Sequence, residues 1–313
     1  MFHRRSPVGR RTPCVEIVLA LILPLVAVGH AGPLLAQDTE ATAEGTGTPP
    51  AESSQTDEEA ADRVPESVVA LQPLFQRIQE ADSIRASVEL SADTVVDGAV
   101  ISQETSVYQI ASTAPDQFTA YLKGEKIQTR VYSDGETAVV ALSPTAFCVL
   151  EKPIAMQNAV FQLPVPLGPY PEAVLALTLA GVDPSLTLTT GMKSVVQVGR
   201  ENFRGRTPSV HFTGLQDDDV RWDLWITEGD QPVPLRLRID LSDMLRANGA
   251  LDMPPGYRFT LRLDFKVWRL NHPNDPSLYR YTKVEGAQEF ESVQAYYRSL
   301  AGEQPSPPPS AEE

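Results

Sequence analysis

Alternation of apolar and polar side chains with a period of two is the feature that most constrains the fold of this chain. It is clearest over residues 258–270, where Phe259 and Val267 bound a run of apolar side chains that alternate with charged or hydroxyl side chains, and it recurs over 235–241. Such rows are typical of strands with one buried and one solvated face, as in antiparallel sheets. At about 3.3 Å per residue the longer row would span roughly 43 Å, so we expect a strongly bent or coiled sheet.

Nine further segments carry strand patterns, and Asp134-Gly135 is a strong hairpin signal between two of them. These segments are 84–91, 99–111, 117–123, 127–133, 136–142, 146–151, 194–203, 207–214 and 220–227. Only two or three short helices accompany the strands: one over 66–81, one over the apolar run from Val174 to Leu179, and one over 241–247. A mainly β fold of about eleven strands follows, and it either closes as a barrel or wraps the helices around an apolar hollow.

The N-terminal segment has the pattern of an export signal. Its basic start precedes an apolar run over 15–28, about fourteen residues, which suits a signal peptide and falls short of the roughly 20 needed to cross a bilayer. We predict a signal peptide over 1–36, cleaved after Ala31 or Ala36, with retention as an anchor as the alternative. The mature protein is then exported and soluble.

Two further segments have the composition of unfolded chain. Residues 37–66 form an acidic linker, and residues 302–313 form a proline-rich tail that ends in acidic residues. Neither holds enough bulky apolar side chains to offset the entropy of ordering. We expect one folded domain over 67–301.

Charge and residue counts exclude several function classes. The net charge of −15 argues against nonspecific binding of nucleic acid, because phosphate would be repelled. Only four His and two Cys are present, and His211, His272 and Cys148 are those that lie beyond the predicted signal peptide. In the sequence these residues show no metal-ligand spacing and no nucleophile–base pattern, and Cys148 reads as a buried thiol. We predict no metal site, no cofactor and no enzyme activity.

Several scattered motifs resemble a known family. They are the helix around Leu74–Ile78, the turn Tyr132-Ser133-Asp134-Gly135, the strand from Val198-Gly199 to Phe203-Arg204-Gly205, and Trp222-Asp223-Leu224-Trp225-Ile226 leading to Pro232-Val233-Pro234-Leu235. Over roughly 67–295 the chain is similar to a family of predicted periplasmic proteins of unknown function, itself similar to the lipoprotein-localisation-factor (LolA/LolB-like) superfamily. The resemblance implies an incomplete, strongly curved antiparallel β-barrel, with helices on its concave side and a cavity that takes acyl chains. It implies no known activity.

The apolar rows supply the candidate binding residues. We interpret them either as a packed core between sheet and helices or as the lining of a lipid pocket. The candidate lining residues are Phe118, Phe147, Val149, Trp222, Leu224, Ile226, Leu237, Ile239, Phe259, Leu261, Leu263 and Phe265. Trp225 has the opposite parity and is expected on the outer face or at an edge.

Two surface features are weighed beside the rows. The segment 241–256 is either an ordinary connection or a lid hinged at Pro254-Pro255-Gly256, and its candidate lid residues are Leu241, Met244, Leu245 and Met253. Arginines at 200, 204 and 206 around a hairpin tip are either a grip for an anionic headgroup or a solvated turn.

The sequence thus favours a periplasmic binding protein for a hydrophobic ligand, an acyl chain of a lipid or lipoprotein. Transient contact with a membrane or an envelope protein would accompany that role. The alternative is an interaction or sensor module of the envelope with the same fold and no bound ligand.

Overall fold

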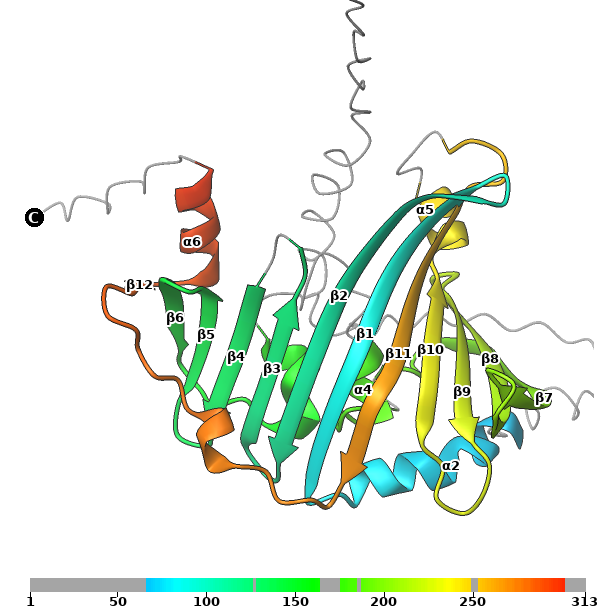
Figure 1. Cartoon of the computed structure of the whole chain (residues 1–313), viewed down its shortest axis with the longest axis horizontal. Coiled ribbons are helices and arrows are strands. Elements are labelled where there is room, and N and C mark those ends of the chain that lie inside the picture. The colour runs from blue at the N-terminus through cyan, green and yellow to red at the C-terminus, as the bar shows by residue number, and fades with distance from the viewer. Residues whose placement is uncertain (1–65, 126–127, 164–174, 185–186, 249–252, 302–313) are drawn as a thin grey trace, which may run out of the picture. The chain divides into compact units, whose positions relative to one another are not determined.

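The computed structural model describes residues 66–125, 128–163, 175–184, 187–248 and 253–301 (Figure 1). The predicted signal peptide, the proline-rich tail and nearly all of the linker lie outside these residues. Within them, a single curved sheet of twelve strands dominates the fold. The strand order is β12-β6-β5-β4-β3-β2-β1-β11-β10-β9-β8-β7, so β12 and β7 form the two edges.

The strands follow the predicted order along the chain. They are β1 (Ser83–Val96), β2 (Ala99–Thr113), β3 (Gln117–Lys123), β4 (Gln128–Asp134), β5 (Ala138–Ser143), β6 (Ala146–Leu150), β7 (Met192–Phe203), β8 (Thr207–Gln216), β9 (Arg221–Thr227), β10 (Pro234–Asp240), β11 (Arg258–Leu270) and β12 (Gln288–Phe290). The mainly β, incompletely closed fold is confirmed, and all eleven predicted strands are present. The sequence analysis missed β12, a short strand that pairs in parallel with β6.

Short helices accompany the sheet. They are α2 (Glu66–Gln79), α3 (Ala159–Gln162), α4 (Leu175–Thr178), α5 (Ser242–Ala247) and α6 (Val293–Leu300), with 3₁₀ turns at Met156–Asn158 and Pro276–Tyr279. The three predicted helices correspond to α2, α4 and α5; α3 and α6 were not predicted. Pro73 lies inside α2 on its exposed side, where the carbonyl that loses its amide partner can bond to water.

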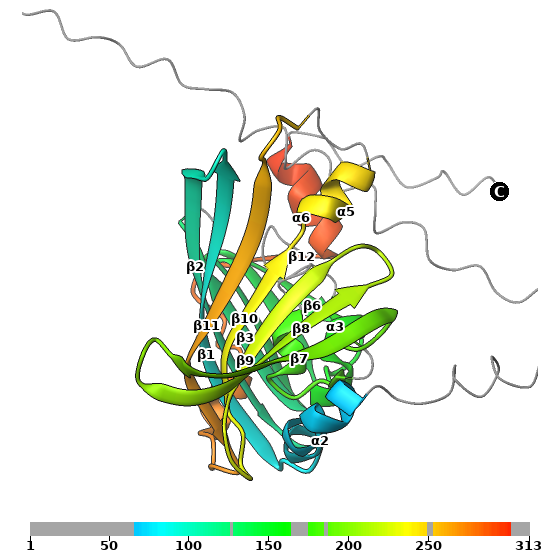
Figure 2. The same ribbon diagram turned by 90° about the vertical axis from the view of Figure 1, so that its right-hand side faces the viewer.

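The concave side of the sheet holds the main hydrophobic core. The amphipathic α2 contributes Leu71, Leu74 and Ile78, each with no exposed surface. Residues of α3, α4 and the segment after α4 join the same cluster as the inward-facing residues of the strands. Figure 2 shows α2 and the green helical turns lying within the curve of the sheet. The helices therefore occupy the concave side, as the resemblance implied.

A β-bulge in the β1–β11 pairing corrects one part of the predicted row. The register runs Ser87 to Val267 and then Val88 to Phe265, so Lys266 is the extra residue. Beyond the bulge the alternation reverses. Val267, predicted to continue the apolar face, pairs with Ser87 on the outer face, while Trp268 packs on the core instead.

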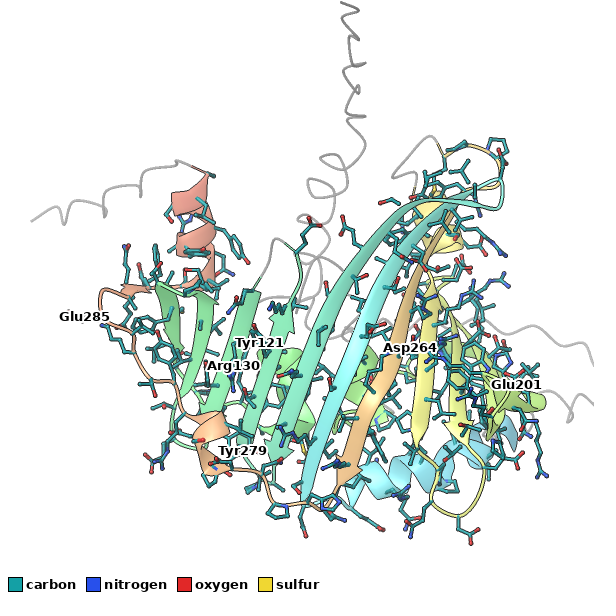
Figure 3. All side chains as sticks on the ribbon, in the orientation of Figure 1. Tyr121, Arg130, Glu201, Asp264, Tyr279 and Glu285 are labelled. Atoms are coloured by element: carbon teal, nitrogen blue, oxygen red, sulfur yellow. The ribbon has the colours of Figure 1, made fainter. Side chains whose placement is uncertain are left out.

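A C-terminal strap, defined here as residues 271–292, crosses the outer face of β1–β6. Tyr279 is buried there, and its hydroxyl hydrogen-bonds that of Thr113 at 2.8 Å. Tyr281 lies against Phe147, with ring centroids 5.0 Å apart. Figure 3 labels Tyr279 and Glu285 along this strap, and the backbone amide of Gln288 donates to Thr145 where β12 begins.

The strap explains why the face predicted for two residues of β6 is wrong. Phe147 and Val149 were assigned to the concave face, but Cys148 is the residue of β6 that faces the main core. Phe147 instead packs with Val139, Ala287 and Tyr281 in a separate cluster under the strap. Val149 is 44% exposed. Both faces of β5 and β6 carry apolar side chains, because the strap covers the face that would otherwise be wet.

On the outer face of the other half, a buried carboxylate gathers arginines from neighbouring strands. Asp264 accepts hydrogen bonds from Arg236 at 2.7 Å and Arg204 at 2.9 Å, and its side chain is 8% exposed (Figure 3). Burial alone would raise the pKa of Asp264, but the hydrogen bond from Arg236 and the surrounding positive charges lower it overall. Arg204 of the hairpin tip thus pairs with Asp264, and this ion pair, rather than a headgroup, is the contact that the structure shows for it.

We expect Asp264→Asn to lower the free energy of unfolding by roughly 2 kcal/mol at neutral pH, since it leaves two arginines without their shared carboxylate. Urea unfolding measures the loss, and Asp230→Asn, an exposed turn residue, is the matched control. Because the folded pKa of Asp264 lies below the ordinary 3.8, its contribution is present above that pH and is lost as the pH falls through the lowered pKa. The difference between Asp264→Asn and wild type should shrink below about pH 4; a difference that persists there contradicts the ion-pair account.

Candidate functional site

The concave face is built from rungs of side chains that run across neighbouring strands. One rung joins Leu90, Leu263, Leu237, Leu224 and Phe212, which are successive partners from β1 to β8. The next rung toward the α5 end of the sheet joins Ala92, Leu261, Ile239, Trp222 and Gly214 in the same way. Cross-strand neighbours of this kind lie about 5 Å apart, so the two rungs form one continuous apolar surface.

Most of the predicted lining residues belong to this surface. Nine of them lie on β9, β10 and β11 and face the main core: Trp222, Leu224, Ile226, Leu237, Ile239, Phe259, Leu261, Leu263 and Phe265. Phe118 is also buried in the main core, but on β3, where its neighbours are Ser112 and Ser133. Phe147 and Val149 are excluded from the surface by their outward direction.

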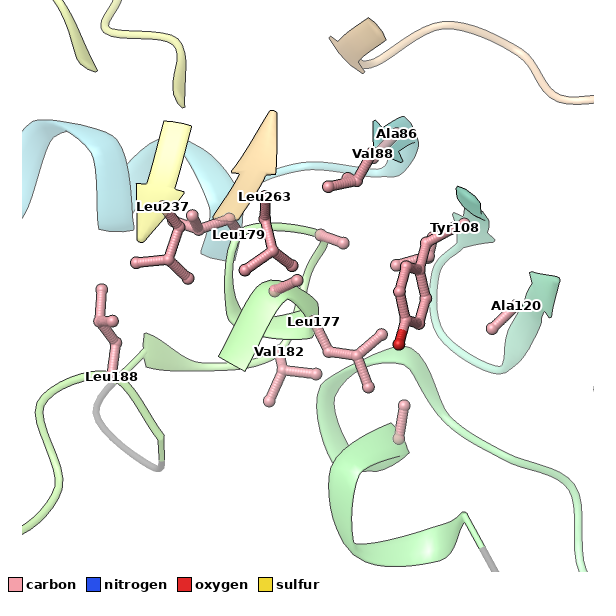
Figure 4. Close-up of a cluster of buried hydrophobic side chains, with 14 of the residues drawn as sticks. Ala86, Val88, Tyr108, Ala120, Leu177, Leu179, Val182, Leu188, Leu237 and Leu263 are labelled. Carbon is pink, nitrogen blue, oxygen red and sulfur yellow. The ribbon is translucent and has the colours of Figure 1, made fainter. Parts of the chain in front are cut away.

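A covering segment, defined as the described residues 175–184 and 187–190, packs onto this surface. Leu177, Leu179, Val182 and Leu188 are buried between the strands and the α4 turn (Figure 4). The sheet here is therefore covered by one short helical turn and irregular chain rather than by a long helix.

Polar contacts fix the covering segment at two places, just after α4 and at its C-terminal end. The indole Nε1 of Trp268 donates to the carbonyl of Leu179 at 2.5 Å. The side-chain amide of Gln216 donates to the carbonyls of Thr187 and Thr190, each at 3.1 Å. The segment is held by side chains of β11 and β8 and shares no strand pairing with the sheet.

Trp222 occupies a tight place on the surface. A Cβ added at its partner Gly214 would lie 2.2 Å from Cε2 of the indole, so only glycine leaves room for the ring. The indole Nε1 is buried, and it has no hydrogen-bond partner in the part of the chain that the structure describes. An unpaired buried donor costs about 1–3 kcal/mol, which makes this nitrogen the one polar anomaly of an apolar surface.

The predicted lid residues divide into two groups. Leu241 is buried, and Met244 and Leu245 of α5 pack against the main core. Met253 is only half-buried and is not in that cluster. The middle of the predicted lid, residues 249–252, lies outside the described residues.

The remaining polar candidates lie elsewhere. His211 stacks on Trp225 at 4.3 Å on the outer face, and its Nε2 is 3.0 Å from Asp223. The outer position predicted for Trp225 is thereby confirmed. Cys148 is buried as predicted, and burial raises the pKa of its thiol. Within the described ranges, no group of three or more His, Cys, Asp or Glu residues is placed to hold a metal ion.

The comparisons with known proteins identify the family. Residues 68–291 match the family described as "Predicted periplasmic protein (DUF2092)". The chain belongs to this family. The resemblance noted from the sequence is confirmed at that level, and the periplasmic location follows from the family's description. None of the helices in the described part of the chain is long and apolar enough to cross a membrane.

Solved structures with a similar fold are distant in sequence. A LolA superfamily protein from Nitrosomonas europaea has 10% identity and a TM-score of 0.30, over 69% of this chain and 97% of that chain. A putative outer membrane lipoprotein-sorting protein domain from Vibrio parahaemolyticus has 9% identity and a TM-score of 0.29, over 68% and 100%. At these values the likenesses identify neither a ligand nor an activity. A search of curated proteins finds no match.

Three parts of the site were missed in the sequence. Trp268 and Tyr108 face the core, and the bulge at Lys266 hid the first of them. Tyr108 shares its parity with Ile110, a signal that was present but diluted by the polar residues around it. The part of the covering segment that follows α4 carries no strand or helix periodicity, so no local pattern predicts where it packs.

We expect Gly214→Ala to destabilise the protein by roughly 2 kcal/mol or more, because the new methyl group must displace the Trp222 indole within a packed face. Thermal unfolding measures the effect. Thr213→Ala, on the opposite face of β8, is the control and should cost less. Combining Gly214→Ala with Trp222→Phe should restore part of the loss; strict additivity of the two changes contradicts the proposed steric conflict.

Proposed function

We propose that the protein is a periplasmic, non-enzymatic binding protein for a hydrophobic ligand, an acyl chain of a lipid or lipoprotein, held on the concave face. The ligand occupies the surface made by β9, β10 and β11 after the covering segment moves aside. Each methylene group removed from water there contributes about 0.8 kcal/mol.

The observation that carries this proposal is the unpaired indole nitrogen of Trp222 in an otherwise apolar surface. Ligand sites are mostly apolar with a few placed polar groups that fix orientation. An acyl chain ends in an oxygen-bearing carboxyl or ester group, which can accept a hydrogen bond from this nitrogen, for which the described residues offer no acceptor.

A second function, an envelope interaction module without a ligand, is favoured by a different observation. Leu177, Leu179 and Val182 already cover the concave surface with chain of the protein itself (Figure 4). In that case the covering segment stays in place, and partners bind through the outer surfaces. Displacement of the covering segment by a ligand separates the two functions.

We expect Trp222→Phe to weaken the binding of a fluorescent fatty acid about three- to ten-fold, because it leaves a smaller aromatic ring at this position and removes the donor. Trp225→Phe is the matched control: its indole pairs with Glu201 on the outer face, so its affinity should equal that of the wild type. Equal affinities for Trp222→Phe and wild type would exclude the indole as the orienting group.

Native mass spectrometry of protein purified gently from the periplasm tests the ligand itself. A reproducible added mass that is lost on denaturation and that extraction identifies as lipid supports the binding function. A clean apo mass, with no uptake of offered fatty acids or phospholipids, supports the interaction module.

Limited proteolysis tests the predicted lid over 241–256. We expect trypsin to cleave after Arg246 more slowly when fatty acid is bound, because Met244 and Leu245 then pack against ligand as well as core. Cleavage within the strap, after Arg280 or Lys283, provides the internal control and should keep its rate. Cleavage after Arg246 that is indifferent to lipid would show that the segment is an ordinary connection.

A further inference from the structure

A polar pocket lies at one end of the sheet, apart from the concave surface. It has a volume of about 320 Å³ and is lined by residues at the start of β9, the end of β10, the start of β11 and in α5. The lining residues are Arg221, Asp240, Ser242, Asp243, Arg246 and Arg258. Figures 1 and 2 both show these strand ends and α5 at the same end of the sheet.

The strand register places the pocket on the outer face. Arg221 precedes the inward-facing Trp222, and Asp240 is the partner of both Arg221 and Thr260. Arg258 has the parity of Thr260, opposite to the inward-facing Phe259. The pocket is therefore distinct from the proposed acyl-chain site, and each can exist without the other.

Two of the three arginines are held in place by one carboxylate. Asp243 accepts from Nε of Arg221 at 3.2 Å and from Nη1 of Arg246 at 2.6 Å. Arg246 also donates through Nη2 to the carbonyl of Tyr257 at 3.2 Å. Neither terminal nitrogen of the Arg221 guanidinium makes a hydrogen bond to a described residue. The two guanidinium groups are thus preorganised, and Arg221 keeps free donors.

The other two charged side chains of the pocket, Asp240 and Arg258, differ in the hydrogen bonds that they make. Asp240 accepts from the backbone amide of Ser242 at 3.0 Å and from its hydroxyl, so the carboxylate is occupied in ordering the start of α5. The side chain of Arg258 makes no ion pair or hydrogen bond with any residue that the structure describes, although its backbone pairs with that of Val95. Three guanidinium groups against two carboxylates leave a local positive charge on a chain whose net charge is −15.

We propose that this pocket binds a phosphate ester, with Arg258 and Arg221 as the residues that contact its oxygens. Guanidinium groups match the geometry of phosphate oxygens through paired hydrogen bonds, and the donors of the Arg258 side chain are free of the described residues. Arg246 acts as a positioning residue, because two of its donors hold Asp243 and the carbonyl of Tyr257. The volume accommodates a phosphate with a small organic group.

Apolar side chains lie next to Arg258 and bear on the organic group of the phosphate ester. Val95 of β1 pairs with Arg258 on one side and with Val100 of β2 on the other, so the three lie in one row. Val100 is 60% exposed. The organic part of an ester bound at Arg258 would extend along this row, beyond the residues that line the pocket, which fits an amphiphilic molecule as well as a soluble one. The phosphate ester is the chemistry shared by both sources.

Calorimetric titration with glycerol 3-phosphate tests the site on the folded wild-type protein. We expect binding that weakens as ionic strength rises from about 0.01 to about 0.15 M, because the Debye length falls from about 30 to about 8 Å. Arg258→Gln should weaken it at least ten-fold while leaving the unfolding curve unchanged, since the Arg258 side chain makes no ion pair or hydrogen bond with the described residues. Arg269→Gln, an exposed arginine near the other end of β11, is the matched control.

Vesicles distinguish the two sources of the ester. Co-flotation with phosphatidylglycerol vesicles that Arg258→Gln abolishes and Arg269→Gln retains would assign the site to a lipid headgroup. Binding of glycerol 3-phosphate without vesicle binding would assign it to a free phosphate ester. Absence of both, or binding that Arg258→Gln leaves unchanged, overturns the proposal. Fatty-acid binding is measured separately, so failure here leaves the concave-face function untouched.

Discussion

The alternation of side chains along each strand is the constraint on which the rest of the structure depends. It gives an open sheet one mainly apolar face, and an open sheet cannot bury that face by closing on itself. Three features bury this face instead: the curve of the sheet, the placement of α2 and the covering segment. The pairing of Gly214 with Trp222 also helps to bury this face, because the absence of a side chain at Gly214 leaves room for the Trp222 indole from the neighbouring strand.

The sequence was most informative where a pattern was local and regular. Period-two rows predicted eleven of the twelve strands, and the parity of Trp222 and Trp225 predicted their opposite faces. It failed where tertiary contacts overrule the pattern. Phe147 is buried on the outer face only because the strap covers it, and Val267 is turned outward by a single inserted residue. The covering segment and the arginine pocket join residues far apart in the chain, so no local signal could assemble them.

The two faces of the sheet divide the chemistry of the protein. The concave face is apolar, with one unpaired donor, while the outer face carries Asp264 and its arginines and, at the strand ends, the arginine pocket. A single strand thus serves packing at one parity and carries charged side chains at the other. This division places the proposed acyl-chain site and the proposed phosphate site on opposite faces of one sheet.

The pairing of β1 with β11 has a consequence for how the chain folds. Strands β1 to β6 are joined by successive hairpins, and so are β7 to β10, but β1 and β11 are separated by most of the domain. Bringing β1 and β11 together closes a long loop, and this costs conformational entropy before the strands gain any contact. Folding is slower when contacts join residues far apart in the chain. We therefore expect the two hairpin arrays to form early and the β1–β11 seam to set the folding rate. Until it forms, each array exposes half of an apolar face, which is the stage at which the nascent protein is most prone to aggregate.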